Sequence, residues 1–474
     1  MSDEPTHIFD RRYRAVTFAI LTLVALSAFE GLAVVAALPG ITRDLEHVEL
    51  LPWVATSYLL CSGVATVAAG GLVDRLGVTP VFRASVVLFL AGSAICGLAP
   101  TMTVMVLGRA LQGIGGGAVN AVGLTAVGLV FPRHLTARAF AANANVWGIM
   151  SVAGPGIAAA LLTFASWRWI FLVNLPICSA ALIIGWRVLP TRRDGAPSGP
   201  LPVFDLVTLT AFSILVLVAI DRLDGWSIPA AFAALLLGGF LTRRSRGRET
   251  ALIRPKHVLD APLGPLGWGI AALLVGSIGT QTYVPLFVIG ARGVGPALAA
   301  WSVVFLVLGW TTGANLSSRL LQTMDAVRLV PRGGALVPLA LVAIGAAVLT
   351  GMPLPAIFVP LIVTGMGCGL STNAAITLVR ERSEDAELGR ATAAHQFVRN
   401  LGFAAGNALV GAVMLHLIGR EVGDVDKLRH AIGEASSGLD LAAPIEQAFG
   451  TAVLCAAAVS ALGLVPLFRL RRAS

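Results

Sequence analysis

Two residues of opposite charge, Glu30 and Arg109, lie inside long apolar stretches of this sequence. Glu30 is the single acidic residue that we place well inside such a stretch. A buried charge costs free energy unless it is paired or hydrated, so charges inside membrane segments usually serve a function. Burial favours the protonated acid, and a nearby guanidinium favours the ionised acid. Glu30 is therefore suited to load and release a proton, with Arg109 as its tuning partner. The alternative is a static ion pair that only fixes helix packing.

The stretches around both residues are long enough to be membrane-spanning helices, over 15–38 and 103–130. A helix rises about 1.5 Å per residue, which puts Glu30 roughly 12 Å and Arg109 roughly 9 Å from helix ends on the same side. We therefore expect the two side chains at a similar depth, in the outer half of the membrane.

The composition predicts an all-α integral membrane protein. Of 474 residues, 56% are hydrophobic and 12% are charged, whereas soluble domains carry about 25% charged residues. The net charge of +9 often indicates a nucleic-acid partner, but here Lys and Arg gather in the loops on one side. We expect a lipid bilayer as the partner and no nucleic acid.

A bilayer crossing needs about 20 apolar residues, and the sequence contains fourteen candidates. The pair 203–220 and 228–242 is the weakest, because 228–242 is short and could be tilted or re-entrant. Without that pair, twelve spans remain and every other orientation is unchanged. The predicted spans are 15–38, 50–72, 80–98, 103–130, 139–164, 169–188, 203–220, 228–242, 262–290, 297–318, 333–351, 354–379, 391–418 and 448–468.

Lys and Arg are distributed unevenly between the two sides. With the N-terminus inside, 25 of the 34 basic residues fall in the inner segments and seven in the outer loops. Basic residues concentrate on the cytoplasmic side of membrane proteins. Both termini are therefore predicted to be cytoplasmic, in a multi-pass protein of the cytoplasmic (inner) membrane.

The sequence shows no motif typical of an enzyme or of a cofactor site. The five cysteines lie far apart in apolar segments, which indicates buried apolar residues rather than disulfides or metal ligands. We find no phosphate-binding loop for ATP and no nucleophile with a base near a water interface. We expect no enzyme activity, no metal and no cofactor.

A glycine-rich turn with two charges follows the second predicted span, in residues 70–77. Its glycines allow a tight turn and close helix approach. This block resembles the signature between spans 2 and 3 of the major facilitator superfamily. The resemblance implies a conformational role for Gly70, Asp74, Arg75 and Gly77.

Further blocks resemble the same family, and they occur on the expected helices. Residues 108–117 in the fourth span keep an Arg, a Gln and several glycines. The fifth span carries Gly148 and then Gly154-Pro155-Gly156, similar to the motif of antiporters, although Ala158 and Ala159 replace its closing glycines. Residues 29–39 and 167–176 resemble the drug:proton antiporter branch with fourteen spans.

The resemblance implies the major facilitator fold, in which two six-helix halves enclose a central cavity and rock about it. The halves would be 15–188 and 262–468, joined by a linker over 189–261 that contains two extra spans, with tails at 1–14 and 469–474. The implied function is proton-coupled export of lipophilic small molecules such as drugs, as in multidrug efflux and antibiotic resistance. The protein would bind protons and the substrate, and it would be a monomer.

Polar and aromatic residues inside the spans are candidates to line the substrate cavity. Each of the polar ones is individually better explained as a helix–helix hydrogen bond. The candidates are Gln112, Asn120, Asn143, Trp147, Gln281, Tyr283 and Asn373.

Other functions remain open on the same fold, because a fold does not fix a substrate. An exporter of a lipid, a cell-envelope component or an endogenous metabolite is favoured slightly by the apolar Leu32 and Val35 of the first span. An importer or uniporter fits the antiporter-like fifth span less well.

Overall fold

The computed structural model describes residues 7–45, 47–188, 203–221, 226–248, 251–384, 387–422 and 442–470. The regular structure of these residues is helical. Parts of the predicted tails, the linker and the last outer loop lie outside the described residues.

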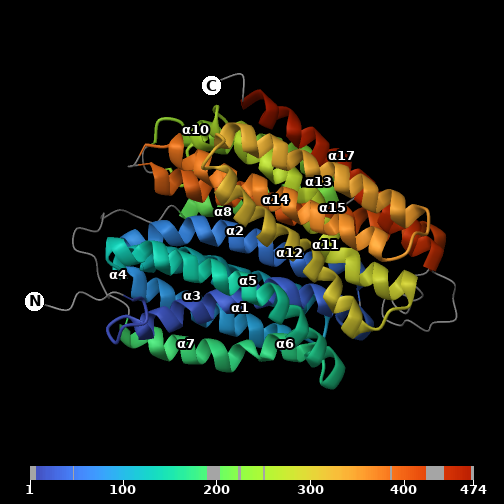
Figure 1. Cartoon of the computed structure of the whole chain (residues 1–474), viewed down its shortest axis with the longest axis horizontal. Coiled ribbons are helices and arrows are strands. Elements are labelled where there is room, and N and C mark those ends of the chain that lie inside the picture. The colour runs from blue at the N-terminus through green and yellow to red at the C-terminus, as the bar shows by residue number, and fades with distance from the viewer. Residues whose placement is uncertain are drawn as a thin grey trace, which may run out of the picture.

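The first bundle contains the helices that carry Glu30 and Arg109. Helix α1 packs against α5 and α7, and α4 lies between α2 and α3. Figure 1 shows these helices side by side, along the long axis of the molecule. The bundle consists of α1 (Arg14–Asp44), a short 3-10 turn η1 (Val48–Leu50), α2 (Leu51–Leu76), α3 (Val78–Gly97), α4 (Met102–Val130), α5 (Arg133–Phe164), α6 (Arg168–Leu172) and α7 (Asn174–Val188).

The second bundle repeats this kind of packing in the C-terminal part of the chain. Here α14 lies between α12 and α13, while α11 packs against α15 and α17. A four-residue helix, α10 (Pro255–Val258), precedes it. The bundle consists of α11 (Leu263–Arg292), α12 (Pro296–Leu320), α13 (Ala326–Leu349), α14 (Pro355–Glu381), α15 (Leu388–Val422) and α17 (Ala442–Arg469).

Close approach through glycines builds corresponding contacts in both bundles. A Cβ added at Gly113 or Gly117 of α4 would overlap the α2 backbone, at Tyr58 and Ser62. In the second bundle, a Cβ at Gly365 of α14 would overlap the α12 backbone in the same way. Small residues four apart let membrane helices touch where larger side chains would hold them apart.

The two bundles meet along α2 with α15 and α5 with α12. A helical hairpin, α8 (Val203–Asp221) and α9 (Ser227–Ser245), lies against α2 and α15. At one end of the hairpin, the Trp53 indole of α2 donates a 2.8 Å hydrogen bond to Asp221. Near its other end, Arg244 pairs with Asp205 at 2.9 Å. Most of the α9 surface is apolar and exposed, as expected for contact with lipid.

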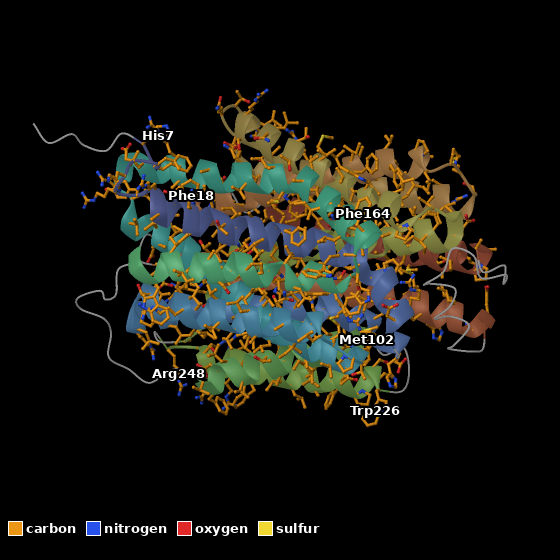
Figure 2. All side chains as sticks on the ribbon, turned by 90° about the horizontal axis from the view of Figure 1, so that it is seen from below. His7, Phe18, Met102, Phe164, Trp226 and Arg248 are labelled. Atoms are coloured by element: carbon orange, nitrogen blue, oxygen red, sulfur yellow. The ribbon has the colours of Figure 1, made fainter. Side chains whose placement is uncertain are left out.

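The turns of the bundle alternate between two ends of the molecule. Figure 2 places His7 and Arg248 at one end, and Met102, Phe164 and Trp226 at the other. This alternation agrees with the predicted order of the loops. The end that carries His7 and Arg248 is called the basic end below.

Among the described residues, twelve helical stretches are long and apolar enough to cross a membrane. This confirms a multi-pass, all-helical membrane protein. The predicted count of fourteen is not confirmed, because α5 and α9 are not among the twelve. A shorter apolar stretch, Gly148–Phe164, lies in the described part of α5, and α9 ends in Arg243 and Arg244.

Candidate functional site

The first bundle encloses an ion pair between α1 and α4. An Nη1 hydrogen of Arg109 is donated to Oε1 of Glu30. The Glu30 side chain is fully buried, and that of Arg109 is 3% exposed. The sequence placed both residues at a similar depth, and the structure brings them together.

Further hydrogen bonds hold this pair in place. The same Arg109 nitrogen donates to Oε1 of Gln112 at 2.6 Å, and its Nε donates to the Val54 carbonyl at 2.9 Å. The second Glu30 oxygen accepts a 2.8 Å hydrogen bond from the Asn174 amide of α7. The hydrogen bonds that Arg109 and Asn174 donate to Glu30 favour its ionised form, whereas its complete burial favours the protonated form.

Two further side chains complete the network. The Gln112 amide donates to the Ser93 hydroxyl of α3 at 2.9 Å. The Tyr58 ring of α2 lies 4.3 Å from the Arg109 guanidinium carbon, a cation–π contact. The sequence alone did not indicate Ser93, Tyr58 or Asn174 as part of the site. One pattern could have indicated Asn174, which is its place in the 167–176 block that resembles the antiporter branch.

A large cavity of about 2190 Å³ lies between the two bundles, and Glu30 and Arg109 belong to its wall. The wall continues past Gly70 and Arg75 of α2 to Arg254 and the start of α15, so the cavity extends toward the basic end. At the opposite end, Gly411 of α15 packs directly against Pro52 of α2. The cavity is therefore long and reaches one end of the bundle.

The candidate cavity residues fall into three groups. Asn120, Gln281 and Asn373 line the cavity. Gln112 faces Arg109 and Ser93 instead, and the Tyr283 hydroxyl donates to the Asn407 carbonyl at 3.3 Å. The side chains of Asn143 and Trp147 lie outside the described residues.

The turn between α2 and α3 consists of one residue, Gly77. Its φ of 85° lies in the left-handed region that favours glycine. Gly70 and Arg75 line the cavity, whereas the side chain of Asp74 lies outside the described residues. This turn therefore places part of the motif at the basic end of the cavity.

The antiporter-like block of α5 lies between the two bundles. Gly154 and Pro155 are buried, and a Cβ at Gly156 would lie 3.6 Å from the Trp301 ring of α12. Gly148 lines the cavity with open space beside it. The block thus contributes both to the contact between bundles and to the cavity wall.

A second charged cluster lies at the basic end, around Glu387. Its carboxylate accepts a 2.6 Å hydrogen bond from Arg254 and lies 3.3 Å from Lys256 and 3.1 Å from His257. Burial acts to raise the pKa of Glu387, but the hydrogen bond from Lys256 and the neighbouring positive charges outweigh it and lower the pKa. The cluster ties α10 to the start of α15.

The family comparison agrees with this geometry. Residues 18–407 match the model of the Major Facilitator Superfamily. The chain belongs to this superfamily of transporters. The resemblance seen in the sequence motifs is thereby confirmed at the level of the family.

Several relatives carry names that refer to drug export. The multidrug transporter protein MdtP of Bacillus subtilis is 28% identical, over 85% of this chain and 75% of its own length. The multidrug efflux pump SdrM of Staphylococcus aureus is 23% identical, over 83% of this chain and 88% of its own length.

Solved structures show the same fold. A bacterial homologue of the human lysosomal transporter Spinster, in an inward-facing and unoccupied conformation, superposes with a TM-score of 0.67 at 16% identity, covering 98% of each chain. A D-xylose–proton symporter gives a TM-score of 0.59 at 14% identity, covering 95% of this chain and 97% of its own. The chain is therefore a transporter by fold and family, and not an enzyme.

Proposed function

We infer that this protein is a proton-coupled exporter of lipophilic small molecules that works by alternating access. The observation that carries the proposal is the Glu30–Arg109 pair in the wall of a cavity between two bundles. A carboxylate that is buried and paired in one state can take up a proton in another, when its surroundings change.

The proposed cycle assigns a role to the state described here. The cavity extends to the basic end, which we assign to the cytoplasm from the positive-inside rule. In this cycle, the inward-open state is the one in which Glu30 releases its proton to the cytoplasm and the cavity accepts substrate. When the bundles rock and the cavity opens outward, substrate leaves and Glu30 is protonated from outside, which resets the transporter.

The rocking units are the predicted halves 15–188 and 262–468, with 189–261 as their linker. The protein functions as a monomer in the cytoplasmic membrane, with both termini inside. The names of the relatives and an apolar cavity wall that includes Val34, Leu306 and Trp310 support lipophilic substrates. Drug efflux and antibiotic resistance are the corresponding cellular roles.

We also assign fourteen crossings, with α8 and α9 as the extra pair. The support is the position of Trp226, at the end that also holds Met102 and Phe164 (Figure 2). A reporter fused at Asp224 tests the assignment, with a fusion at Ser474 as the cytoplasmic reference. We expect an external signal at Asp224. A cytoplasmic signal there would leave twelve crossings.

Transport by purified protein in vesicles tests the function itself. With the basic end facing outward and the vesicle interior acidified, an exporter takes up a lipophilic dye only while the proton gradient lasts. We expect a protonophore to abolish uptake. Uptake that ignores the gradient would favour a uniporter, and uptake that requires the opposite gradient would favour an importer.

The same vesicles distinguish drug export from the second candidate function, which is export of a lipid or cell-envelope component. The apolar Val35 in the cavity wall is the observation that favours it. Gradient-driven movement of a labelled phospholipid without movement of the dye would replace the drug-export proposal with this one.

A further inference from the structure

One face of α15 presents a row of polar and aromatic side chains to the cavity. The spacing of three or four residues places them on one side of the helix. Three of them have buried polar atoms without a protein partner: Oε1 of Gln396, Nε of Arg399, and both polar side-chain atoms of Asn407, a residue that is 1% exposed. The row consists of Gln396, Arg399, Asn400, Phe403 and Asn407.

Arg399 is the charged member of this row. Among the described residues, no carboxylate pairs with its guanidinium, and its buried Nε has no hydrogen-bond partner. Within the described part of the chain, its guanidinium lies over the Phe403 ring, 5.5 Å from the ring centroid. A charge inside a membrane normally pairs with an opposite charge, so Arg399 has capacity for a negative group from outside the protein.

The net charge of the rest of the cavity wall is also positive. Glu30 is already neutralised by Arg109, and Glu387 by the basic cluster around it. A cleft lined by one sign of charge raises the local concentration of opposite charges and repels like ones. The lining cations of the described residues are Arg75, Arg109, Arg254, Arg390 and Arg399, against the carboxylates Glu30 and Glu387.

An apolar wall adjoins Arg399. The Phe403 ring lies 6.3 Å from the Trp310 ring of α12, and both line the cavity. Flat apolar groups stack on such rings. The wall is placed to hold the apolar body of a molecule whose charged end reaches Arg399.

We propose that the substrate is an amphipathic anion, whose acidic group binds Arg399 while its apolar body lies against Trp310 and Phe403. A carboxylate or a sulfonate has the oxygen acceptors that a guanidinium binds best. The Asn407 amide supplies a further hydrogen-bond donor. This proposal rests on the proposed export function and narrows its substrates to organic acids; lipophilic cations are repelled.

A pair of dyes with one ring system tests the charge preference. Fluorescein carries negative charge at neutral pH, whereas rhodamine 123 is a cation with the same xanthene frame. Binding of each to the purified full-length protein in detergent is measured by fluorescence polarisation. We expect fluorescein to bind at least tenfold more tightly than rhodamine 123, since a charge-assisted hydrogen bond is worth about a factor of ten or more.

Three variants test which residue causes the preference for the anionic dye. Arg399→Gln should abolish it and Arg399→Lys should restore part of it, because the charge returns without the paired donors. Arg390→Gln removes the same charge at the basic end of the cavity and should leave the preference within about threefold. Equal losses in Arg390→Gln and Arg399→Gln would mean that total charge, and not Arg399, decides.

Equal or tighter binding of rhodamine 123 to the unchanged protein would overturn the proposal, as would binding of neither dye. Failure of the export function has a different signature. Fluorescein would then bind with the expected dependence on Arg399, but vesicles would not move it when a proton gradient is applied.

Discussion

The arginines inside the helices of the two bundles have opposite surroundings. Arg109 is 3% exposed and is held by a carboxylate, an amide and a backbone carbonyl. Arg399 lines the cavity, and no carboxylate of the described residues pairs with it. Because Glu30 neutralises Arg109, protonation of Glu30 leaves the Arg109 charge unpaired, and this change can couple proton binding to movement of the helices. Arg399 has no carboxylate partner among the described residues, so an anionic ligand can supply one.

The scaffolds around these arginines are nevertheless alike. In both bundles, glycines let a central helix touch its neighbour, α4 on α2 and α14 on α12. The bundles thus differ in chemistry and not in packing. In the proposed mechanism, the first bundle carries the proton and the second bundle binds the charged group of the substrate.

Removing the acid should have the largest effect on this division. Glu30→Gln keeps the size and hydrogen bonding of the side chain but cannot release a proton at physiological pH. We expect dye binding to persist while uptake against a gradient is lost. Substrate-driven proton release from vesicles measures this. The control is Glu49→Gln, because Glu49 is exposed and its ion pair in the described residues is with His47. Release at the unchanged rate in Glu30→Gln would exclude Glu30 as the proton carrier.

Removing each arginine in turn tests the comparison itself. Arg109→Ala leaves Glu30 buried without its cation, and breaking a buried pair costs about 3–5 kcal/mol. Arg399→Ala leaves no carboxylate behind and should change the free energy of unfolding by less than about 1 kcal/mol. Thermal unfolding in detergent measures both variants. Similar losses would show that Arg399 is as firmly built into the structure as Arg109.

The likeness of the scaffolds predicts matched effects of overpacking. Gly113→Leu and Gly365→Leu each insert a side chain where a helix backbone already lies. We expect each to cost about 1–3 kcal/mol or more of stability. Gly123→Ala is the control, because a Cβ there meets no atom within 4 Å. If only one of the two substitutions lowers the free energy of unfolding, the helix packing of the two bundles differs despite their similar backbones.

The cluster at the basic end should give the smallest effect. The lowered pKa of Glu387 means that its ion pairs stabilise the protein above the ordinary glutamate range and lose that contribution as pH falls through the lowered pKa. Glu387→Gln should therefore cost about 1 kcal/mol or less at pH 7. Its difference from the unchanged protein should shrink below about pH 4. A difference that stays constant with pH would mean that packing, not charge, holds α10 to α15.

Much of the fold could be predicted from the sequence. Long apolar runs and few charges require a membrane, and four motifs in order indicate the superfamily. The approximate depth of Glu30 and Arg109 also followed from counting residues along helices. The count of fourteen spans is not confirmed, because α9 is short and ends in two arginines and the described apolar stretch of α5 is shorter than a full span. Their assignment depends on neighbours and not on their own composition.

The sequence by itself determined which residues are chemically unusual: one deep acid, and arginines inside apolar helices. Only the tertiary structure decided what each of them faces. Asn174 reaches Glu30 from 144 residues away, Gln112 turns to the ion pair, and Arg399 turns to the cavity. The physical reason is rotation about the helix axis. Hydropathy fixes how deep a residue lies in the membrane, but the packing of neighbouring helices fixes the direction in which its side chain points.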